Sequence, residues 1–352
     1  MTHKAALYLH TYISAISTPV HNFSSQSHIQ ENVFYTESPV SFFRLLTMSI
    51  ANSMRQRAPL STAIRQGEAY DRFRFDEDPD DLFAEVEALR SRVAQKTDYL
   101  IETLAHVVYG SNFIEKAGSD MDTTLRTCNK IFHGEDLAEE ADEDLPQETR
   151  EVIQHCRAMS HHINETVVAD KPLTEALTLS THKILTYKVR SSDGDSHEQY
   201  GGKYRTDSVC AGMHEFTAPK DVPRAMSSMI NEYNDDMARI AADGSVDPFC
   251  LAAKYCHKFV NIHPFADGNG RTCRIILNAM LLKYAGIVVP IGEDDEGREA
   301  YLEVAGRSSM SETDRDEEEE MVCGAPPPWG ELASLTLLCA RKNLVECVGK
   351  IE

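Results

Sequence analysis

Apolar residues recur at helical spacing along most of this chain, and this periodicity is the feature that most limits its fold. Between 79 and 114, leucines and valines return every three or four residues, as expected for one face of one long helix or of two short ones. With 42% apolar residues in 352, the chain can bury a sizeable core. We predict a mostly α fold, with helices over 79–114, 122–132, 151–185, 222–241, 248–260, 269–284 and 332–348.

A second pattern interrupts the helices between 202 and 219. Val209, Ala211, Met213 and Phe216 alternate there with polar residues and lie among glycines and a proline, which is typical of a short β-hairpin. The flanking stretches differ again, because 135–148 is acidic and poor in apolar residues and 191–202 is polar. We predict solvated loops over both stretches.

Composition excludes several classes of partner. A formal net charge of -21 disfavours a sequence-independent grip on nucleic acid, which needs clustered Lys and Arg. No apolar run reaches the roughly 20 residues that a membrane helix needs. The nine cysteines are scattered and form no CxxC pair, which favours a reducing, intracellular compartment, with the cytoplasm as the expected location. The first 50 residues carry few charges and leave an organelle-targeting interpretation open.

The chemistry of the chain is concentrated between His263 and Arg274. Pro264 prevents the preceding helix from continuing, and Gly268 and Gly270 lie where a new helical pattern starts. Glycines at a helix N-terminus let backbone N–H groups approach an anion, so this loop is a candidate phosphate cradle. Arg271 and Arg274 share a face of the new helix and can reach further phosphate oxygens.

Two other side chains of this loop complete a candidate reaction site. Asp267 offers a hard oxygen ligand for Mg²⁺ that bridges the phosphates. His263 is the one group of the loop that can accept a proton near neutral pH and so activate an incoming hydroxyl.

The twelve residues from His263 to Arg274 match a family pattern at every specified position. The pattern is His-Pro-Phe-x-Asp/Glu-Gly-Asn-Gly-Arg-x-x-Arg, and the chain therefore resembles the Fic family over about 100–301. Upstream, Gly202, Tyr204, Arg205 and Val209 resemble the segment that precedes the family's flap hairpin. The resemblance implies a Fic-type helical core and an enzyme that transfers AMP from ATP, with Mg²⁺, to a Ser, Thr or Tyr hydroxyl of a target protein.

The resemblance also assigns roles to single residues. His263 would be the general base, Asp267 the metal ligand, and Tyr301 a neighbour of the adenine. The phosphates would be held by Gly268, Asn269, Gly270, Arg271 and Arg274, and the target segment by the flap residues Val209, Gly212, Met213 and His214. Gly270 is intact, which favours AMP transfer over the kinase-like branch that has Lys at this position.

Ser111 and Glu115 resemble the family's inhibitory motif, Ser/Thr-x-x-x-Glu followed by Gly or Asn. One helical turn separates them, so the resemblance implies that Glu115 reaches Arg274 as a bidentate partner and denies it to the nucleotide. Lys116 departs from the motif. Two rival functions stay open, which are removal of AMP from a target, with Glu115 orienting a water, and non-catalytic nucleotide-dependent docking. Relatives with this motif often dimerise, so a homodimer is a candidate assembly.

These features divide the chain into four expected parts. They are a partly disordered N-terminal extension over 1–78, a helical segment with the inhibitory helix over 79–150, a Fic core over 151–311, and an acidic and proline-rich insertion with a C-terminal helix over 312–352.

Overall fold

The computed structural model describes residues 70, 77–93, 97–133, 135, 145–211, 214–243, 246–317 and 327–350. The extension expected over 1–78 lies outside these residues except for 70, 77 and 78, and so does most of the acidic stretch at 135–148. Gly212 and Met213 of the expected flap also lie outside them, as does 318–326 of the expected insertion. Within the described ranges, every helix is too short or too polar to cross a bilayer.

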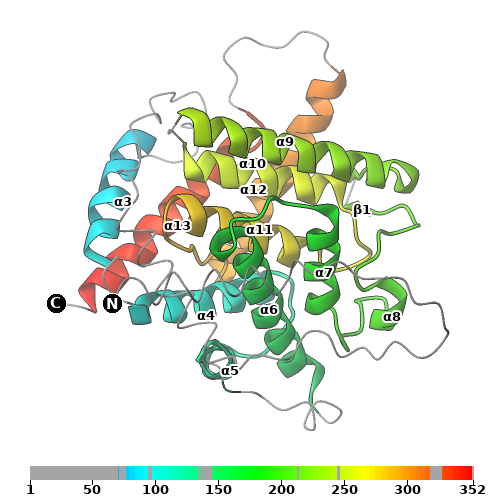
Figure 1. The fold of residues 1–352 in the computed structure, drawn as a ribbon, viewed down its shortest axis with the longest axis horizontal. Helices are drawn as coiled ribbons and strands as arrows, with labels where there is room; N and C mark the ends of the chain where they lie inside the picture. Colours follow the sequence, from blue (N-terminus) through cyan, green and yellow to red (C-terminus); the bar gives the residue numbers. More distant parts are fainter. Residues whose placement is uncertain are drawn as a thin grey trace, which may run out of the picture. The chain divides into compact units, whose positions relative to one another are not determined.

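Helices make up nearly all of the described structure, as predicted (Figure 1). Their order is α3 (Pro79–Val93), α4 (Thr97–Ile114), α5 (Met121–Phe132), α6 (Gln147–Ile163), α7 (Glu175–Leu185), α8 (His197–Tyr200), α9 (Val222–Asp243), α10 (Pro248–Ile262), α11 (Asn269–Tyr284), α12 (Asp295–Glu317) and α13 (Gly330–Gly349). A π-helical turn, Asn164–Val168, extends α6, and a short 3-10 turn, Pro219–Asp221, precedes α9.

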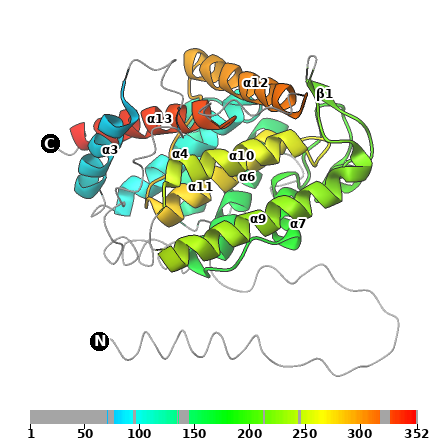
Figure 2. The ribbon, with the colours of Figure 1, turned by 90° about the horizontal axis from the view of Figure 1, so that it is seen from above.

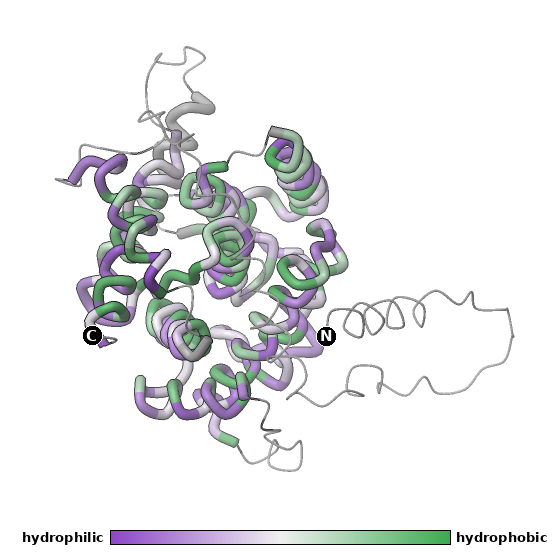
Figure 3. Tube along the Cα trace, turned by 60° about the vertical axis from the view of Figure 1, so that its left-hand side comes forward, coloured by the Kyte–Doolittle hydropathy of each residue, from purple (hydrophilic) through white to green (hydrophobic). Residues whose placement is uncertain are grey.

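Helix α11 lies at the centre of the core. Its apolar residues, from Ile275 to Leu282, are buried whichever way they face, which is typical of a helix surrounded by others. Helix α10 runs beside α11, and α3 packs against α13 (Figure 2). The surrounding helices alternate between hydrophobic and hydrophilic stretches, as helices with one face in the core do (Figure 3).

The predicted hairpin is present and small. Strand β1 (Cys210–Ala211) pairs antiparallel with β2 (His214–Glu215), with Cys210 opposite Glu215 and Ala211 opposite His214. Positions 212 and 213, between the two strands, lie outside the described residues. We refer to residues 209–216 as the flap hairpin.

The apolar stretch over 79–114 forms two helices, which is one of the two predicted alternatives. Two sequence-based expectations need correction. The loop expected over 191–202 contains the short helix α8. Helix α12 was not predicted, and residues 312–317, expected to begin an insertion, continue it. Asp295 and Glu296 lie in the first turn of α12, where acidic residues are stabilised by the helix dipole.

Candidate active site

His263 ends α10 in a left-handed backbone conformation, with φ 49° and ψ 60°. Such a conformation costs a residue with a Cβ about 1–2 kcal/mol, so the surroundings must hold it. The ring stacks on Phe216 of the flap hairpin, with ring centroids 4.0 Å apart. Position 263 is therefore strained and packed, and the helix before it ends just ahead of Pro264.

The tautomer of His263 follows from one contact. Its Nδ1 lies 3.2 Å from the carbonyl oxygen of Val260. A carbonyl oxygen only accepts hydrogen bonds, so Nδ1 carries the hydrogen and Nε2 keeps its lone pair. Burial lowers the pKa of His263 below 6.5, although Glu115 and Asp267 act in the opposite direction. The ring is therefore neutral at pH 7, and Nε2 can accept a proton.

We call residues 263–268 the His263 loop, and it leads directly into the N-terminus of α11. Gly268 is the N-cap of α11 and adopts φ 79°, a conformation that favours glycine. The side chain of Asn269 bonds both backbone groups of Phe265, at 2.9 Å to its N–H and 2.8 Å to its carbonyl. Asn269 thus closes the loop with its side chain. The first N–H groups of α11 have no partner within the helix and are oriented for an anion.

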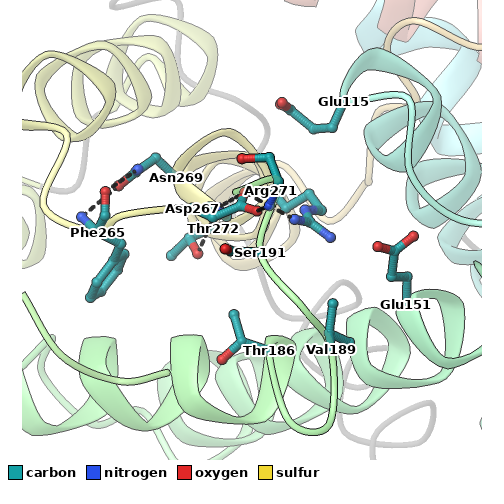
Figure 4. A network of polar contacts seen from close by, with 12 residues as sticks. Glu115, Glu151, Thr186, Val189, Ser191, Phe265, Asp267, Asn269, Arg271 and Thr272 are labelled. Atoms are coloured by element: carbon teal, nitrogen blue, oxygen red, sulfur yellow. Dashed lines mark hydrogen bonds and ion pairs between the residues drawn. The ribbon is translucent and has the colours of Figure 1, made fainter. Parts of the chain in front are cut away.

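Asp267 lies at the edge of this N-terminus (Figure 4). Its Oδ2 accepts a hydrogen bond from the backbone N–H of Ser192 at 2.8 Å, and its Oδ1 accepts from Gly268 N–H and, at 3.4 Å, from Arg271. Each carboxylate oxygen has two lone pairs, so one remains on Oδ2. Mg²⁺ is usually bound by one or two carboxylates together with substrate phosphates, and Asp267 fits that arrangement.

Arg274 is buried below the N-terminus of α11 and has several partners. Its Nε donates to Ser111 Oγ at 2.9 Å, its Nη2 donates to the carbonyl of Ser111 at 2.8 Å, and its Nη1 lies 3.3 Å from the hydroxyl of Tyr301. Burial alone would lower the pKa of Arg274, but the neighbouring Glu115 and Tyr301 raise it, so the guanidinium stays charged. Tyr301 therefore lies against this guanidinium.

Glu115 provides the counter-charge from the turn just after α4. Its Oε1 lies 2.6 Å from Nη2 of Arg274, and the side chain extends from the end of α4 toward the start of α11 (Figure 4). A Cβ placed on Gly270 would lie 2.0 Å from the same oxygen, so the carboxylate rests on the first turn of α11. The predicted contact between Glu115 and Arg274 is present, but one nitrogen meets one oxygen. The expected bidentate pair is wrong. One N–H of Nη2 meets one carboxylate oxygen, while Ser111 accepts from Nε and from the other N–H of Nη2, and Tyr301 lies at Nη1.

The turn that presents Glu115 is fixed by its neighbours. The carbonyl of Asn112 accepts the N–H groups of Glu115 and Ala117, each at 3.0 Å. The N–H of Gly118 donates to Oε2 of Glu151 on α6 at 2.7 Å. Lys116 adopts φ 56°, a left-handed conformation that asparagine or glycine adopts more easily. The family motif has Gly or Asn at the position where this chain has Lys116.

His182, on α7, supports the His263 loop and was not predicted as a site residue. Its Nε2 donates to the carbonyl of Asp267 at 2.8 Å, and its Nδ1 accepts the N–H of Gly202 at 2.9 Å. The ring stacks on Phe265 at 3.6 Å, and burial lowers its pKa to about 4. The available sequence signal was a histidine within an apolar helical pattern, which does not show what the ring contacts.

The flap hairpin approaches the loop from the other side. His214 on β2 packs edge-on against Phe216 at 4.9 Å, and Phe216 in turn stacks on His263. Val209 is joined to Phe216 by a backbone hydrogen bond of 3.4 Å across the base of the hairpin. Of the four predicted flap residues, the structure thus places Val209 and His214 near His263, and Gly212 and Met213 lie outside the described residues.

Comparisons with known proteins identify a family whose members match both this loop and this helical fold. The model of the Fic/DOC family matches residues 172–281, which include the His263 loop and most of α11. A Fido domain-containing protein from Dictyostelium discoideum is 36% identical over 107 residues, which cover 30% of this chain and 72% of that relative. The chain belongs to the Fic/DOC family.

A relative with a named activity and a solved structure extend the comparison. Protein adenylyltransferase Fic from Nematostella vectensis is 37% identical over 91 residues, which cover 26% of this chain and 20% of that protein. The match thus spans about a fifth of the adenylyltransferase. A Fic domain-containing signaling protein from Bacteroides thetaiotaomicron has the same fold, with a TM-score of 0.56 at 20% identity over 76% of this chain and 93% of that one. Relatives named in this way support an enzyme of the Fic-type nucleotidyltransferase class.

Proposed function

We propose that this chain is a protein adenylyltransferase, which moves the AMP part of ATP onto a Ser, Thr or Tyr hydroxyl of a target protein, and that Glu115 holds it inactive. One observation carries the proposal. A neutral histidine whose Nε2 keeps its lone pair lies beside a helix N-terminus suited to phosphates, and the buried arginine of that helix is paired with Glu115.

The proposed chemistry needs one proton transfer and one displacement. The target hydroxyl gives its proton to Nε2 of His263 while its oxygen forms a bond to the α-phosphorus of ATP. The bond from that phosphorus to the oxygen bridging to the β-phosphate breaks, and pyrophosphate leaves. Such transfers depend mainly on positioning and on stabilisation of charge. The N–H groups at the start of α11, with Arg271 and Arg274, would supply that stabilisation.

Asp267 would hold Mg²⁺ against the phosphates. When bound there, the ion would supply positive charge that neutralises the phosphate oxygens and the leaving pyrophosphate. The backbone N–H of Ser192 and the guanidinium of Arg271 orient the carboxylate for this role, because both fix its oxygens from the protein side.

Glu115 would oppose ATP by occupying two parts of the site together. Its carboxylate neutralises Arg274, which the distal phosphates need, and it rests on the first turn of α11 at Gly270. If ATP bound with its γ-phosphate on Arg274, the negative phosphate would lie next to the negative carboxylate of Glu115. The nucleotide would therefore adopt an unproductive pose or displace the side chain of Glu115.

Labelled ATP tests the proposed reaction. We expect the Glu115→Gly variant to retain label on protein from α-labelled ATP and none from γ-labelled ATP, because only the AMP part is transferred. Label from the γ position would indicate a kinase. Absence of label from both positions, with nucleotide still bound, would favour a non-catalytic docking protein that uses the flap hairpin.

A second candidate is the removal of AMP from a modified protein at the same site. The side chain of Glu115 is 35% exposed, so water reaches the carboxylate, and its charge partly opposes the lowering of the His263 pKa by burial, as a nearby group would. An AMP-modified target incubated with the wild type and with Glu115→Gly separates the two by mass spectrometry. Loss of AMP from the target only with the wild type would favour removal of AMP as the function.

That the chain acts on a target protein, and that it forms a homodimer, remain predictions.

A further inference from the structure

Arg205 forms hydrogen bonds with the backbone of the turn at His263. Its Nε donates to the carbonyl of His263 at 2.6 Å, and its Nη2 lies 3.4 Å from the carbonyl of Ile262. Its own backbone N–H donates to the carbonyl of Pro264 at 2.9 Å. One residue therefore holds three consecutive carbonyl groups, on both sides of the strained position 263.

The same guanidinium also holds both ends of the flap hairpin. Its Nη1 donates to the carbonyl of Asp207 at 2.7 Å, just before the first strand, and its Nη2 donates to the carbonyl of Thr217, just after the second. Thr217 follows Phe216, the residue whose ring stacks on His263. The flap hairpin and the His263 loop are thus fixed to each other through one side chain.

Arg205 is buried, and burial is unfavourable for its positive charge. The residue is 6% exposed, and its partners among the described residues are main-chain carbonyls. Burial lowers its pKa, which shows that the pocket opposes the charge. A lysine would carry the same charge, but its compact ammonium cannot span the two segments as a planar guanidinium does.

We infer that Arg205 is a positioning residue, which holds His263 and the target-binding flap in one fixed relation so that the target hydroxyl meets Nε2. This inference rests on the proposed adenylyltransferase function and adds to it. A left-handed histidine persists only where its surroundings over-determine it, and the three gripped carbonyls provide that restraint. Arg205 would contribute nothing to ATP binding.

The test compares Arg205→Met, Arg205→Lys and Arg90→Met, each in the Glu115→Gly background. Arg90 is the matched control because it is also buried and donates to a carbonyl, that of Ala285, at 2.9 Å, on a different part of the fold. For each variant, kcat and KM for a target protein, the Kd for ATP, and backbone hydrogen exchange over 205–217 and 259–265 are measured.

We expect Arg205→Met to lower kcat by about 100-fold, the scale of loss from misplaced reacting groups, to raise KM for the target, and to leave the Kd for ATP within about twofold. Arg205→Lys should recover about a tenth of the activity, since it restores one bond to His263 but not the bridge. Exchange over both segments should rise at least about tenfold in Arg205→Met and stay unchanged in Arg90→Met.

Three results would overturn the inference. They are unchanged exchange in both segments, an equal loss of kcat in Arg90→Met, and a parallel loss of ATP binding. If Arg205→Met does not fold, Arg205→Lys decides by the same measurements. If the Glu115→Gly parent transfers no AMP, the proposed function fails, and the exchange data still decide whether Arg205 joins the flap hairpin to the loop.

Discussion

Replacement of Glu115 is the sharpest perturbation that the structure offers. The contact to be removed is a single charge-assisted hydrogen bond, 2.6 Å long, between Oε1 of Glu115 and Nη2 of Arg274. The arginine side chain is 3% exposed and the glutamate side chain 35% exposed. Water therefore reaches only the carboxylate end of the pair. The free energy contributed by this hydrogen bond should lie in the lower half of the usual range for bonds to charged groups.

The size of the effect follows from that contact. A hydrogen bond to a charged group contributes about 1.5–3 kcal/mol, and because one partner of this pair is partly exposed we take about 2 kcal/mol. Since each 1.4 kcal/mol is a factor of ten, loss of the bond should favour productive ATP by roughly 30-fold. Glu115→Gln keeps the length of the side chain and a hydrogen bond from the charged guanidinium but loses the negative charge of the acceptor, so we expect a smaller gain, of roughly fivefold.

The assay is the initial rate of label transfer from α-labelled ATP, at ATP below its KM, for the wild type and both variants. Glu165→Gln is the control, because Glu165 forms an ion pair of similar length, 2.7 Å to Lys171, that involves neither α4 nor the His263 loop. Its rate should stay within about twofold of the wild type. Equal rates for wild type and Glu115→Gly would refute the proposed inhibition.

Three further predictions concern other residues. His263→Ala should abolish transfer while calorimetry still detects ATP binding, and retained transfer would remove His263 from its proposed role. Lys116→Asn should raise the free energy of unfolding in urea by about 1 kcal/mol, because asparagine tolerates φ 56° better, and no gain would show that the turn is unstrained. Burial lowers the pKa of His162 to about 3 from 6.5, so the unfolded chain takes up a proton that the folded chain refuses. Between pH 7 and 5.5 the wild type should therefore lose about 1 kcal/mol more stability than His162→Gln, and equal losses would contradict this.

Local patterns were sufficient for the elements that depend on neighbours in sequence. Helix α11 was predicted with its observed bounds, because Gly268 and Gly286 interrupt the chain on either side of an apolar helical stretch. The pairing of Glu115 with Arg274 was also predicted, on the strength of the family motif. Its geometry was not, since a sequence does not show that Ser111 accepts two of the guanidinium N–H groups and that Tyr301 lies at a third.

The features that were not predicted depend mainly on contacts between segments that are distant in the sequence. His182 precedes Asp267 by 85 residues, and its bond to the carbonyl of that residue exists only once α7 packs beside the loop. Arg205 was recognised as part of a motif, but its five carbonyl partners come from three separate segments. Helix α12 was missed because its charged surface obscures the few residues it buries, Tyr301 among them.

The position of the Glu115 carboxylate has a consequence for any measurement of this protein. A competitor attached to the chain has an effective concentration set by its tether, on the order of millimolar for short flexible linkers and higher for a fixed turn. Dilution of the protein cannot lower that concentration, whereas an inhibitor supplied by a second molecule would dissociate. If Glu115 blocks its own site, the specific activity of the wild type should be independent of protein concentration, and only ATP or a change in the turn after α4 can alter it.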